Sequence, residues 1–421
     1  MNLFLIPRSS TIFLRVVVSA ASLLAIPNGL NAEDAEQSVR PRLTARAKDL
    51  HASSIVIDGH NDLPWKIRAD GDGNFQKLDI SKPQPKLHTD IPRLRQGGVG
   101  AQFWSVWVPV DLGYQGTALL TTIEQIELVK KMAETYPDDF EIALTVEDIR
   151  RIHADGKIAS LIGVEGGHCI ENSISSLNHL HQLGARYMTL THADSLDWAD
   201  SATDDEKAGG LSPFGKEVVQ RMNTLGMMVD ISHVSVPTMH DVLNISQAPV
   251  IFSHSSARAV ADSPRNVPDE VLKRLPEKDG IVMVNYYSAF IVPEAARIYH
   301  EGVAIKRKLQ MEGKTADEIQ AAVARHRKQN PMPAGTFNDV IEHIDHLVKT
   351  AGWQHVGLGS DYDGVGLVPA GLEDVSTYPY ITQALLDRGY TDEQIRGILG
   401  ENLLRVMAKI ETTGQQLRQN Y

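Results

Sequence analysis

Histidine and carboxylate side chains follow short apolar runs at six places along the chain. These side chains are His60 and Asp62, Glu165, His192, His233, His254, and Asp361. Imidazole nitrogens and carboxylate oxygens are ligands that zinc and other divalent metals take in proteins. One or two such placements could arise by chance. Six of them indicate a single site, provided that the fold gathers the ends of the runs.

Five of these residues form a ligand set that suits two metal ions: His60, Asp62, Glu165, His233 and His254. Side chains alternate along a strand, so a His-x-Asp pair places both side chains on one face. Three imidazoles with two carboxylates favour Zn²⁺, followed by Mn²⁺ or Co²⁺. A catalytic zinc usually takes three protein ligands and a water, so five ligands predict two ions that share a carboxylate. Two ions about 3.5–4 Å apart can hold a hydroxide and polarise a carbonyl group.

Eight apolar runs predict the strands that position these residues. The runs are Ser54–Ile57, Val99–Val108, Ala159–Val164, Tyr187–Leu190, Met227–Ile231, Val250–Phe252, Ile281–Val284 and Val356–Leu358. Helical patterns, such as Pro213–Leu225 and Val236–Leu243, lie between most of them. The repeat predicts an α/β fold, a (β/α)8 TIM-like barrel of the metal-dependent hydrolase type, with a doubly wound open sheet as the alternative. In a barrel, the carboxyl ends of the strands meet on one face.

The first 32 residues have the pattern of a signal peptide. Arg8 and Arg15 precede the apolar run Val16–Ile26, and the stretch ends at the small residue Ala32. An uncleaved membrane anchor is the alternative, but the run is about half of the roughly 20 residues that a span needs. We therefore expect cleavage near Ala32 and an exported protein, periplasmic or secreted, without a stable membrane anchor.

Residues 33–421 are expected to form a single domain with one helical insertion. The segment 294–333 is long and charged, with basic clusters at 306–308 and 325–328, and it falls between the last two predicted strands. We expect a solvated insertion. A lid over the barrel mouth or a contact in a homodimer is the alternative.

The charge and cysteine content exclude two classes of site. Lys and Arg number 41 against 53 Asp and Glu, which gives a formal net charge of −12. A nucleic-acid-binding protein needs a basic face against phosphate, so no nucleic acid is expected as a partner. Cys169 is the only cysteine, which excludes an intrachain disulfide and a thiolate zinc site.

Five further histidines are assigned structural or surface roles. His168 lies just past a predicted strand end, where we expect it to support the structure. His343 and His346 fall on an amphipathic helical pattern and are expected on its surface. His179 and His181 likewise are expected on a helix.

Eight stretches resemble the renal, or membrane, dipeptidase family of binuclear zinc peptidases. They are IDGHNDLPW (57–65), TDIPRLRQGGVGAQFWSVWV (89–108), IGVEGGHCI (162–170), LTHADSLDWAD (190–200), GMMVDISHVS (226–235), PVIFSHSSARAVADSPRNVPDEVL (249–272), HVGLGSDYDG (355–364) and GENLLRVM (400–407). They follow the family's order and cover nearly the whole chain after the signal. The resemblance implies the same barrel.

The resemblance also implies which residues hold the metals. His60 and Asp62 would ligate one zinc, and His233 and His254 would ligate the second. Glu165 would bridge the two Zn²⁺ ions.

The remaining implied roles concern small dipeptide substrates. His192 would contact the substrate near the scissile carbonyl, Arg265 would hold its C-terminal carboxylate, and Asp361 would transfer protons. A zinc-bridging hydroxide would attack the peptide bond. The family tolerates D-residues on the C-terminal side, and some members open β-lactams. The chain lacks the bridging cysteines and the lipid-anchor tail of the animal enzymes, and its 294–333 segment is long.

Two other functions remain open at this stage. A deaminase or another amidohydrolase on the same barrel would use the same His-x-Asp pair and the last-strand Asp361. A non-catalytic binding protein could retain the fold, although every expected ligand is present.

Overall fold

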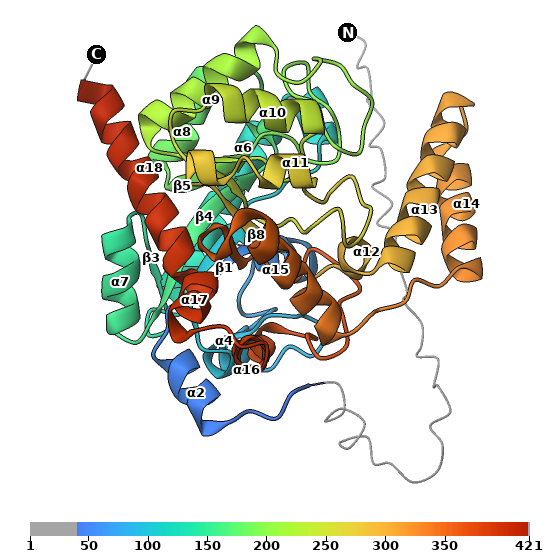
Figure 1. The fold of residues 1–421 in the computed structure, drawn as a ribbon. Helices are drawn as coiled ribbons and strands as arrows, with labels where there is room; N and C mark the ends of the chain where they lie inside the picture. The colour runs from blue at the N-terminus through green and yellow to red at the C-terminus, as the bar shows by residue number, and fades with distance from the viewer. Residues whose placement is uncertain (1–39, 420–421) are drawn as a thin grey trace, which may run out of the picture.

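A computed structural model describes residues 40–419, in which eight parallel strands close into a barrel (Figure 1). The barrel strands are β1 (Val56–Asn61), β2 (Val99–Ser105), β4 (Ile158–Glu165), β5 (Ala185–Thr189), β6 (Met228–Asp230), β7 (Val250–Phe252), β8 (Ile281–Val284) and β9 (Val356–Leu358). The strands pair in that order, and β1 also pairs with β9. The predicted (β/α)8 barrel is confirmed, and the open-sheet alternative was wrong.

One strand escaped prediction. β3 (Phe140–Ile142) pairs with the first half of β4, outside the ring that closes the barrel. It has three residues, and only Phe140 is fully buried. A segment that short carries too few side chains to show an apolar pattern.

The first strand is longer than its apolar run. β1 continues past Ile57 through Asp58, Gly59, His60 and Asn61, and all six of its residues are buried. Polar residues at these positions are buried because they face the barrel mouth, where other polar groups meet them. The sequence prediction ended this strand too early because it followed hydrophobicity alone.

Helices surround the barrel. They are α2 (Ala45–Ala52), α3 (Leu63–Gly71), α4 (Ile91–Gln96), α5 (Asp111–Tyr114), α6 (Ala118–Thr135), α7 (Val146–Ala154), α8 (Ile174–Gln182), α9 (Pro213–Leu225), α10 (Val236–Ile245), α11 (Asp269–Leu272), α12 (Ser288–Ile291), α13 (Pro293–Met311), α14 (Ala316–Gln329), α15 (Phe337–Ala351), α16 (Tyr378–Asp387), α17 (Asp392–Arg396) and α18 (Asn402–Gln419). The bounds of α9 follow from local chemistry. The Ser212 hydroxyl accepts the Gly215 N–H at its start, and Gly226 adopts a left-handed φ of 75° at its end.

A glycine makes room for a large buried side chain, that of Tyr187. Gly163 on β4 faces Tyr187 on β5, and a Cβ at Gly163 would lie 2.0 Å from the Tyr187 ring. The ring can therefore cross the barrel interior toward β1 only because position 163 has no side chain.

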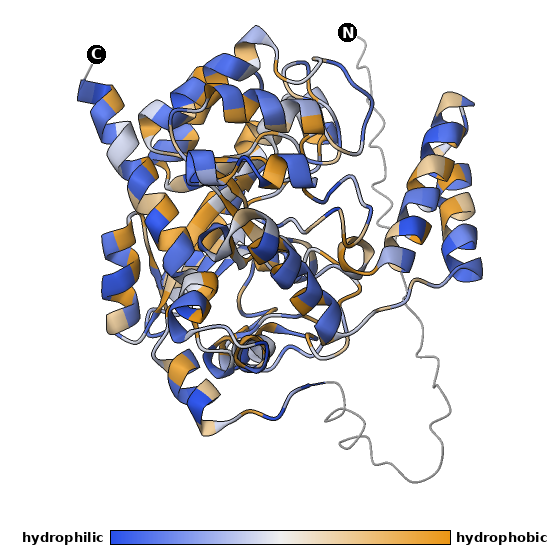
Figure 2. Ribbon diagram, viewed as in Figure 1, coloured by the Kyte–Doolittle hydropathy of each residue, from blue (hydrophilic) through white to orange (hydrophobic). Residues whose placement is uncertain are grey.

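The segment 294–333 holds two helices, α13 and α14, which stand beside each other at the side of the barrel (Figure 1). Hydrophilic residues run along both helices, interrupted by a few hydrophobic ones (Figure 2). None of the residues of α14 is buried. We call this pair of helices the α13–α14 hairpin.

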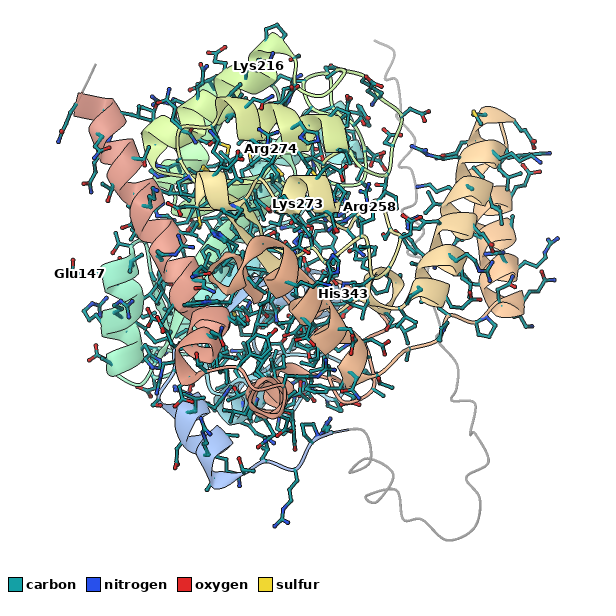
Figure 3. All side chains as sticks on the ribbon, viewed as in Figure 1. Glu147, Lys216, Arg258, Lys273, Arg274 and His343 are labelled. Atoms are coloured by element: carbon teal, nitrogen blue, oxygen red, sulfur yellow. The ribbon has the colours of Figure 1, made fainter. Side chains whose placement is uncertain are left out.

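The surface assignment of His343 was wrong. His343 lies on α15 (Figure 3) and is fully buried. Its Nδ1 accepts the Ala257 N–H at 3.0 Å, and its Nε2 lies 2.9 Å from the Ile291 carbonyl oxygen. The amphipathic pattern identified the helix correctly, but α15 turns this position toward the barrel. His346 is half-buried and bonds Asp269. His179 and His181 lie on α8, as predicted.

The predicted signal peptide lies outside the described residues. Within residues 40–419, no helix combines the length and the apolar character needed to cross a membrane.

Candidate active site

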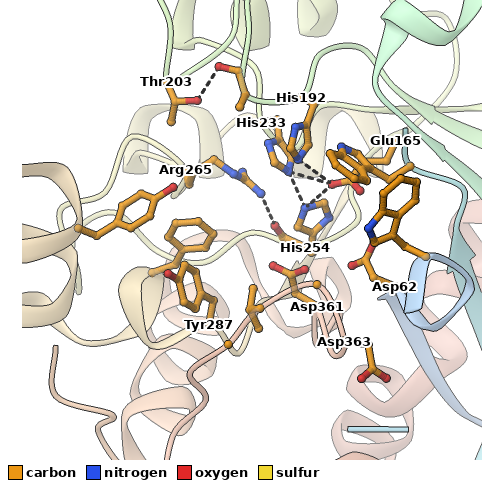
Figure 4. Close-up of a pocket in the computed structure, with 18 of the residues that line it drawn as sticks. Asp62, Glu165, His192, Thr203, His233, His254, Arg265, Tyr287, Asp361 and Asp363 are labelled. Atoms are coloured by element: carbon orange, nitrogen blue, oxygen red, sulfur yellow. Dashed lines mark hydrogen bonds and ion pairs between the residues drawn. The ribbon is translucent and has the colours of Figure 1, made fainter. Parts of the chain in front are cut away.

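All of the predicted ligand residues meet at the carboxyl end of the barrel. Figure 4 labels Asp62, Glu165, His233 and His254 among them. Only His60 and Glu165 belong to strands; the others lie in the loops one to three residues past a strand end. Most of them line a cavity of about 450 Å³, and His60 lies buried behind its wall. The cavity is lined by Asp62, Trp65, Lys66, Trp107, Glu165, His192, Ala193, Thr203, His233, His254, Arg265, Tyr287, Phe290, Tyr299, Asp361, Asp363, Gly364, Val365 and Gly366.

Glu165 stands at the centre of the cluster, and its two carboxylate oxygens face different partners. Oε2 lies 3.4 Å from His60 Nε2. Oε1 lies 3.1 Å from His233 Nε2 and 3.5 Å from His254 Nε2. The surrounding imidazoles hold the pKa of Glu165 well below its usual range, although burial alone would raise it. The carboxylate is therefore charged and divided between two sets of nitrogen donors.

The donor atoms are spaced for metal ions. His60 Nε2 lies 3.3 Å from Asp62 Oδ2 but has no hydrogen-bond partner among the described residues. The Nε2 atoms of His233 and His254 face each other at 2.8 Å. Three overlapping groups of donors lie close enough to hold an ion: His60, Glu165 and His254; Glu165, His192 and His233; and His60, Asp62 and Asp361. Nitrogen and carboxylate donors in this arrangement suit Zn²⁺ or a similar divalent ion.

Tyr187 fixes the orientation of His60. The Tyr187 hydroxyl lies 2.9 Å from His60 Nδ1 and donates to the Gly59 carbonyl oxygen at 3.3 Å. Because the hydroxyl proton is used there, Nδ1–H must donate to the tyrosine oxygen. That assignment leaves the lone pair of Nε2 directed at the cluster, which is the protonation state that a metal ligand needs.

A buried aspartate, Asp230, fixes the orientation and protonation of His254 through a serine hydroxyl. Asp230 accepts hydrogen bonds from the hydroxyls of Thr189 and Ser253 at 2.5 and 2.6 Å and joins strands β5, β6 and β7. The Ser253 oxygen lies 2.8 Å from His254 Nδ1. Since the Ser253 proton goes to Asp230, His254 Nδ1–H donates to Ser253. His254 Nε2 is thereby also free to bind a metal.

A second buried aspartate joins the first and last strands. Asp58 accepts hydrogen bonds from the Ser360 hydroxyl and the Tyr378 hydroxyl, each at 2.6 Å.

Two residues of the cluster have a left-handed backbone. Asp361, which follows Ser360, has a φ of 65°, and His233 has a φ of 68°. Such backbone conformations cost free energy in residues other than glycine and persist where the surroundings fix them. Here they direct both side chains into the cluster.

Asp361 lines the cavity and lies beside His60 and Asp62 in the cluster. The Asn285 amide donates to its Oδ2 at 2.8 Å. Burial raises the pKa of Asp361 well above its ordinary value, and the neighbouring Asp62 raises it further. The carboxyl group therefore holds a proton more readily than an exposed aspartate does.

Arg265 approaches the cluster from the opposite side of the cavity (Figure 4). It is 3% exposed, its Nη2 donates to the His254 carbonyl oxygen at 3.3 Å, and its guanidinium lies 5.1 Å from the centre of the Phe290 ring. Within residues 40–419, no carboxylate forms an ion pair with it, and Nε has no partner. Asp269, the acid four residues further along the chain, bonds His346 instead. A buried arginine without an acid is suited to bind an anionic ligand group.

The sequence profile of the membrane dipeptidase family, peptidase family M19, matches residues 44–421. The chain belongs to this family. The fold is similar to that of the probable dipeptidase PvdM from Pseudomonas aeruginosa, at 24% identity over 87% of this chain and 98% of that one, with a TM-score of 0.78. It is also similar to a metallo peptidase from Rhodobacter sphaeroides liganded with a phosphinate mimic of the dipeptide L-Ala-D-Ala, at 23% identity over 85% and 99% of the chains, with a TM-score of 0.69.

Membership in the membrane dipeptidase family makes the chain a metal-dependent hydrolase, as predicted. His168 lies outside the three donor groups. Its Nε2 lies 2.9 Å from the Val108 carbonyl oxygen, so it supports the loop after β4, as the sequence predicted.

Several residues that line the cavity or support it from behind were not singled out in the sequence. Trp65 and Trp107 pack edge to face, with ring centres 4.7 Å apart, and Trp107 lies 5.6 Å from the His192 ring. Both tryptophans fall within stretches that resemble the membrane dipeptidase family. Asn285 follows a predicted strand end directly, so the rule that found the ligands could have found it. Tyr187 and Tyr299 carry no such signal.

Proposed function

We propose that the chain is a binuclear zinc dipeptidase that acts on substrates with a free C-terminal carboxylate. One observation carries this proposal. The two oxygens of Glu165 face separate donor sets, and the same cavity contains a buried Arg265 without an acidic partner. The first feature suits a pair of metal ions bridged by a carboxylate. The second suits a ligand with an anionic end.

The chain's own residues divide the work of catalysis. His60 and Asp62 would hold one ion, His233 and His254 the other, and Glu165 both. Two divalent ions bound there would supply an activated water and polarise the scissile carbonyl.

His192 is placed to contact the carbonyl oxygen. It is the most exposed of the cluster histidines, at 28% of its side chain, and its ring lies against that of His233, with the centres 4.5 Å apart and the planes tilted by 33°. Burial lowers its pKa. The neutral ring can donate a hydrogen bond to an oxygen that gains negative charge, which stabilises the transition state.

Asp361 is placed to accept a proton from the attacking water and deliver it to the leaving amine. A raised pKa suits this exchange, because a group that both gains and loses a proton works best when its pKa lies near the ambient pH. Asn285 holds the carboxylate in position through its 2.8 Å hydrogen bond.

Arg265 would bind the substrate carboxylate through two parallel hydrogen bonds, a geometry that its planar guanidinium provides. A carboxylate held one residue past the scissile bond directs cleavage to the C-terminal peptide bond. A dipeptide has only this bond, and tripeptides assayed beside a dipeptide library test whether longer peptides are also cleaved. C-terminal D-residues and certain β-lactams, which also carry a free carboxylate near a cleavable amide, belong to the same proposal.

A dipeptide library with L- and D-residues at each position, assayed with and without a chelator, tests the function. We expect hydrolysis of dipeptides, loss of activity with the chelator, and about two zinc ions per chain by elemental analysis. Full activity with one ion would contradict the binuclear site. Release of ammonia from nucleosides without dipeptide cleavage would favour a deaminase.

Export is a separate proposal from the N-terminal sequence. Terminal sequencing of the mature protein should begin near residue 33. An intact Met1 would contradict cleavage.

A further inference from the structure

The active-site cavity has a neighbouring cavity with which it shares part of its wall. A second cavity of about 300 Å³ lies between the loop after β5 and the α13–α14 hairpin. Ala193, Thr203 and Tyr299 line both cavities. Because their walls are shared, a ligand in the active site can extend past Tyr299 toward the hairpin.

The C-terminal residue of a bound dipeptide would be the part nearest to this opening. Arg265, which in the proposed function holds the carboxylate, stacks on Phe290. Phe290 meets Tyr299 and Tyr287 edge to face, with ring centres 5.9 and 4.9 Å away. A side chain on the residue held by Arg265 therefore lies beside these three rings. Trp65 and Trp107, which pack near His192 and Asp62, belong to the other end of the cavity.

The second cavity has basic groups that the protein does not neutralise. Arg307 lies 3.7 Å from Asp204 and 3.5 Å from Asp205 and is paired with them. Lys306 and Arg327 also line the cavity, and neither forms an ion pair with another described residue. Asp194 is the acid of the cavity that lacks a basic partner in the described chain. Two free cations against one free acid leave the cavity positive.

Arg327 lines the second cavity together with Tyr299, which also lines the active site. Burial raises the pKa of Tyr287 to about 12, and Arg327 acts in the opposite direction on Tyr287 and on Tyr299. Arg327, although carried by the exposed helix α14, therefore places its positive charge in the cavity that adjoins the active site at Tyr299.

We propose that the α13–α14 hairpin forms a subsite for the side chain of the substrate's C-terminal residue, and that this subsite favours a side chain ending in a carboxylate. The proposal rests on the proposed dipeptidase function. Tyr299 forms the inner wall of the subsite. Lys306 and Arg327 attract the distal carboxylate, and the aromatic rings contact its methylene groups.

Alanyl-glutamate and alanyl-glutamine test the proposal, because they differ in charge and hardly in size. In the wild type we expect kcat/KM to be about fivefold higher for the glutamate peptide, the scale of one partly exposed ion pair. Arg327→Gln should lower this ratio to about twofold, and Arg327→Gln with Lys306→Gln should lower it to about one. Arg325→Gln, on the same helix but outside both cavities, should retain the wild-type ratio. The wild-type ratio should also fall as salt is raised.

A wild-type ratio of one or less would overturn the subsite, as would a ratio unchanged in the double variant. Alanyl-alanine separates this failure from failure of the function itself. Hydrolysis of alanyl-alanine at equal rates in all variants, without a glutamate preference, would leave the dipeptidase standing and remove the subsite. Absence of hydrolysis of all three peptides by the zinc-loaded wild type would contradict the function.

Discussion

The barrel mouth and the α13–α14 hairpin face the same substrate cavity but are built in different ways. At the mouth, the donors are buried, and two aspartates beneath them, Asp58 and Asp230, bind four hydroxyl groups from neighbouring segments. On α14, no residue is buried. The hairpin nevertheless places Tyr299 in the cavity wall.

This contrast separates the requirements of catalysis from those of specificity. Metal ligands must hold their positions within fractions of an ångström, which strand ends braced by a hydrogen-bonded network can provide. A side-chain subsite tolerates looser geometry, so an exposed insertion can supply it. Substitutions at the mouth should therefore affect turnover far more than substitutions on the hairpin do.

The largest effect is expected at Glu165. Glu165→Gln keeps the size of the side chain but removes the charge that two ions would share. We expect loss of one metal ion and a fall in kcat of at least about a thousandfold, the scale of losing a major electrostatic contribution. Metal analysis and steady-state kinetics measure both effects. Glu134→Gln, on the exposed face of α6, is the control and should change neither. If Glu165→Gln keeps two ions and normal turnover, Glu165 is not the bridge.

Arg265 should show the next largest effect, since it binds the substrate and does not hold the metals. Arg265→Ala removes a charge-assisted hydrogen bond that contributes about 1.5–3 kcal/mol, so kcat/KM should fall about ten- to several hundredfold, mainly through KM. The wild type should prefer alanyl-alanine over its C-terminal amide, and the variant should discriminate little. A variant that keeps the wild-type preference for the acid would show that another residue binds the carboxylate.

The sequence located the candidate ligands because their signal is simple. His60, Glu165 and the loop residues His233, His254 and Asp361 each follow an apolar run, and a barrel brings the ends of such runs together. The groups that orient them were missed. Tyr187 reaches His60 across the barrel from a strand interior, and only the three-dimensional packing against Gly163 reveals it.

Two other misses have the same physical origin. Helical periodicity identifies α15 but does not decide how far its buried face extends, so His343 was assigned to the surface. Composition identifies the 294–333 segment as charged and helical, but it does not reveal that Tyr299 turns into the cavity. Long-range packing determines both, and no local pattern reports it.

His343 links the hairpin side of the molecule to the barrel, and its effect should be on stability. Burial lowers its pKa to about 4, against an ordinary value of 6.5. The folded protein therefore keeps this ring neutral, while the unfolded chain binds a proton below about pH 6.5. Stability should fall as the pH drops from 6.5 toward 4, by at most about 3 kcal/mol from this residue. In His343→Gln, the dependence of unfolding free energy on pH should be flatter over this range. Denaturant titrations at several pH values measure this free energy. If it changes with pH equally in both proteins, His343 does not make this contribution.

The smallest effect is expected on the hairpin itself, and it tests the comparison directly. Ala321 is exposed on α14 and lines neither cavity. Ala321→Gly should weaken its helix by about 1 kcal/mol. If the hairpin opens independently of the barrel, hydrogen exchange of α14 amides should accelerate about fivefold while the thermal midpoint of the barrel stays unchanged.

Ala408→Gly is the matched control, since α18 packs its Met407 and Ile410 into the core, and it should lower the midpoint by about 1–2 °C. A midpoint lowered equally by both substitutions would show that hairpin and barrel unfold together, and the division between a rigid catalytic mouth and a locally mobile specificity element would not hold.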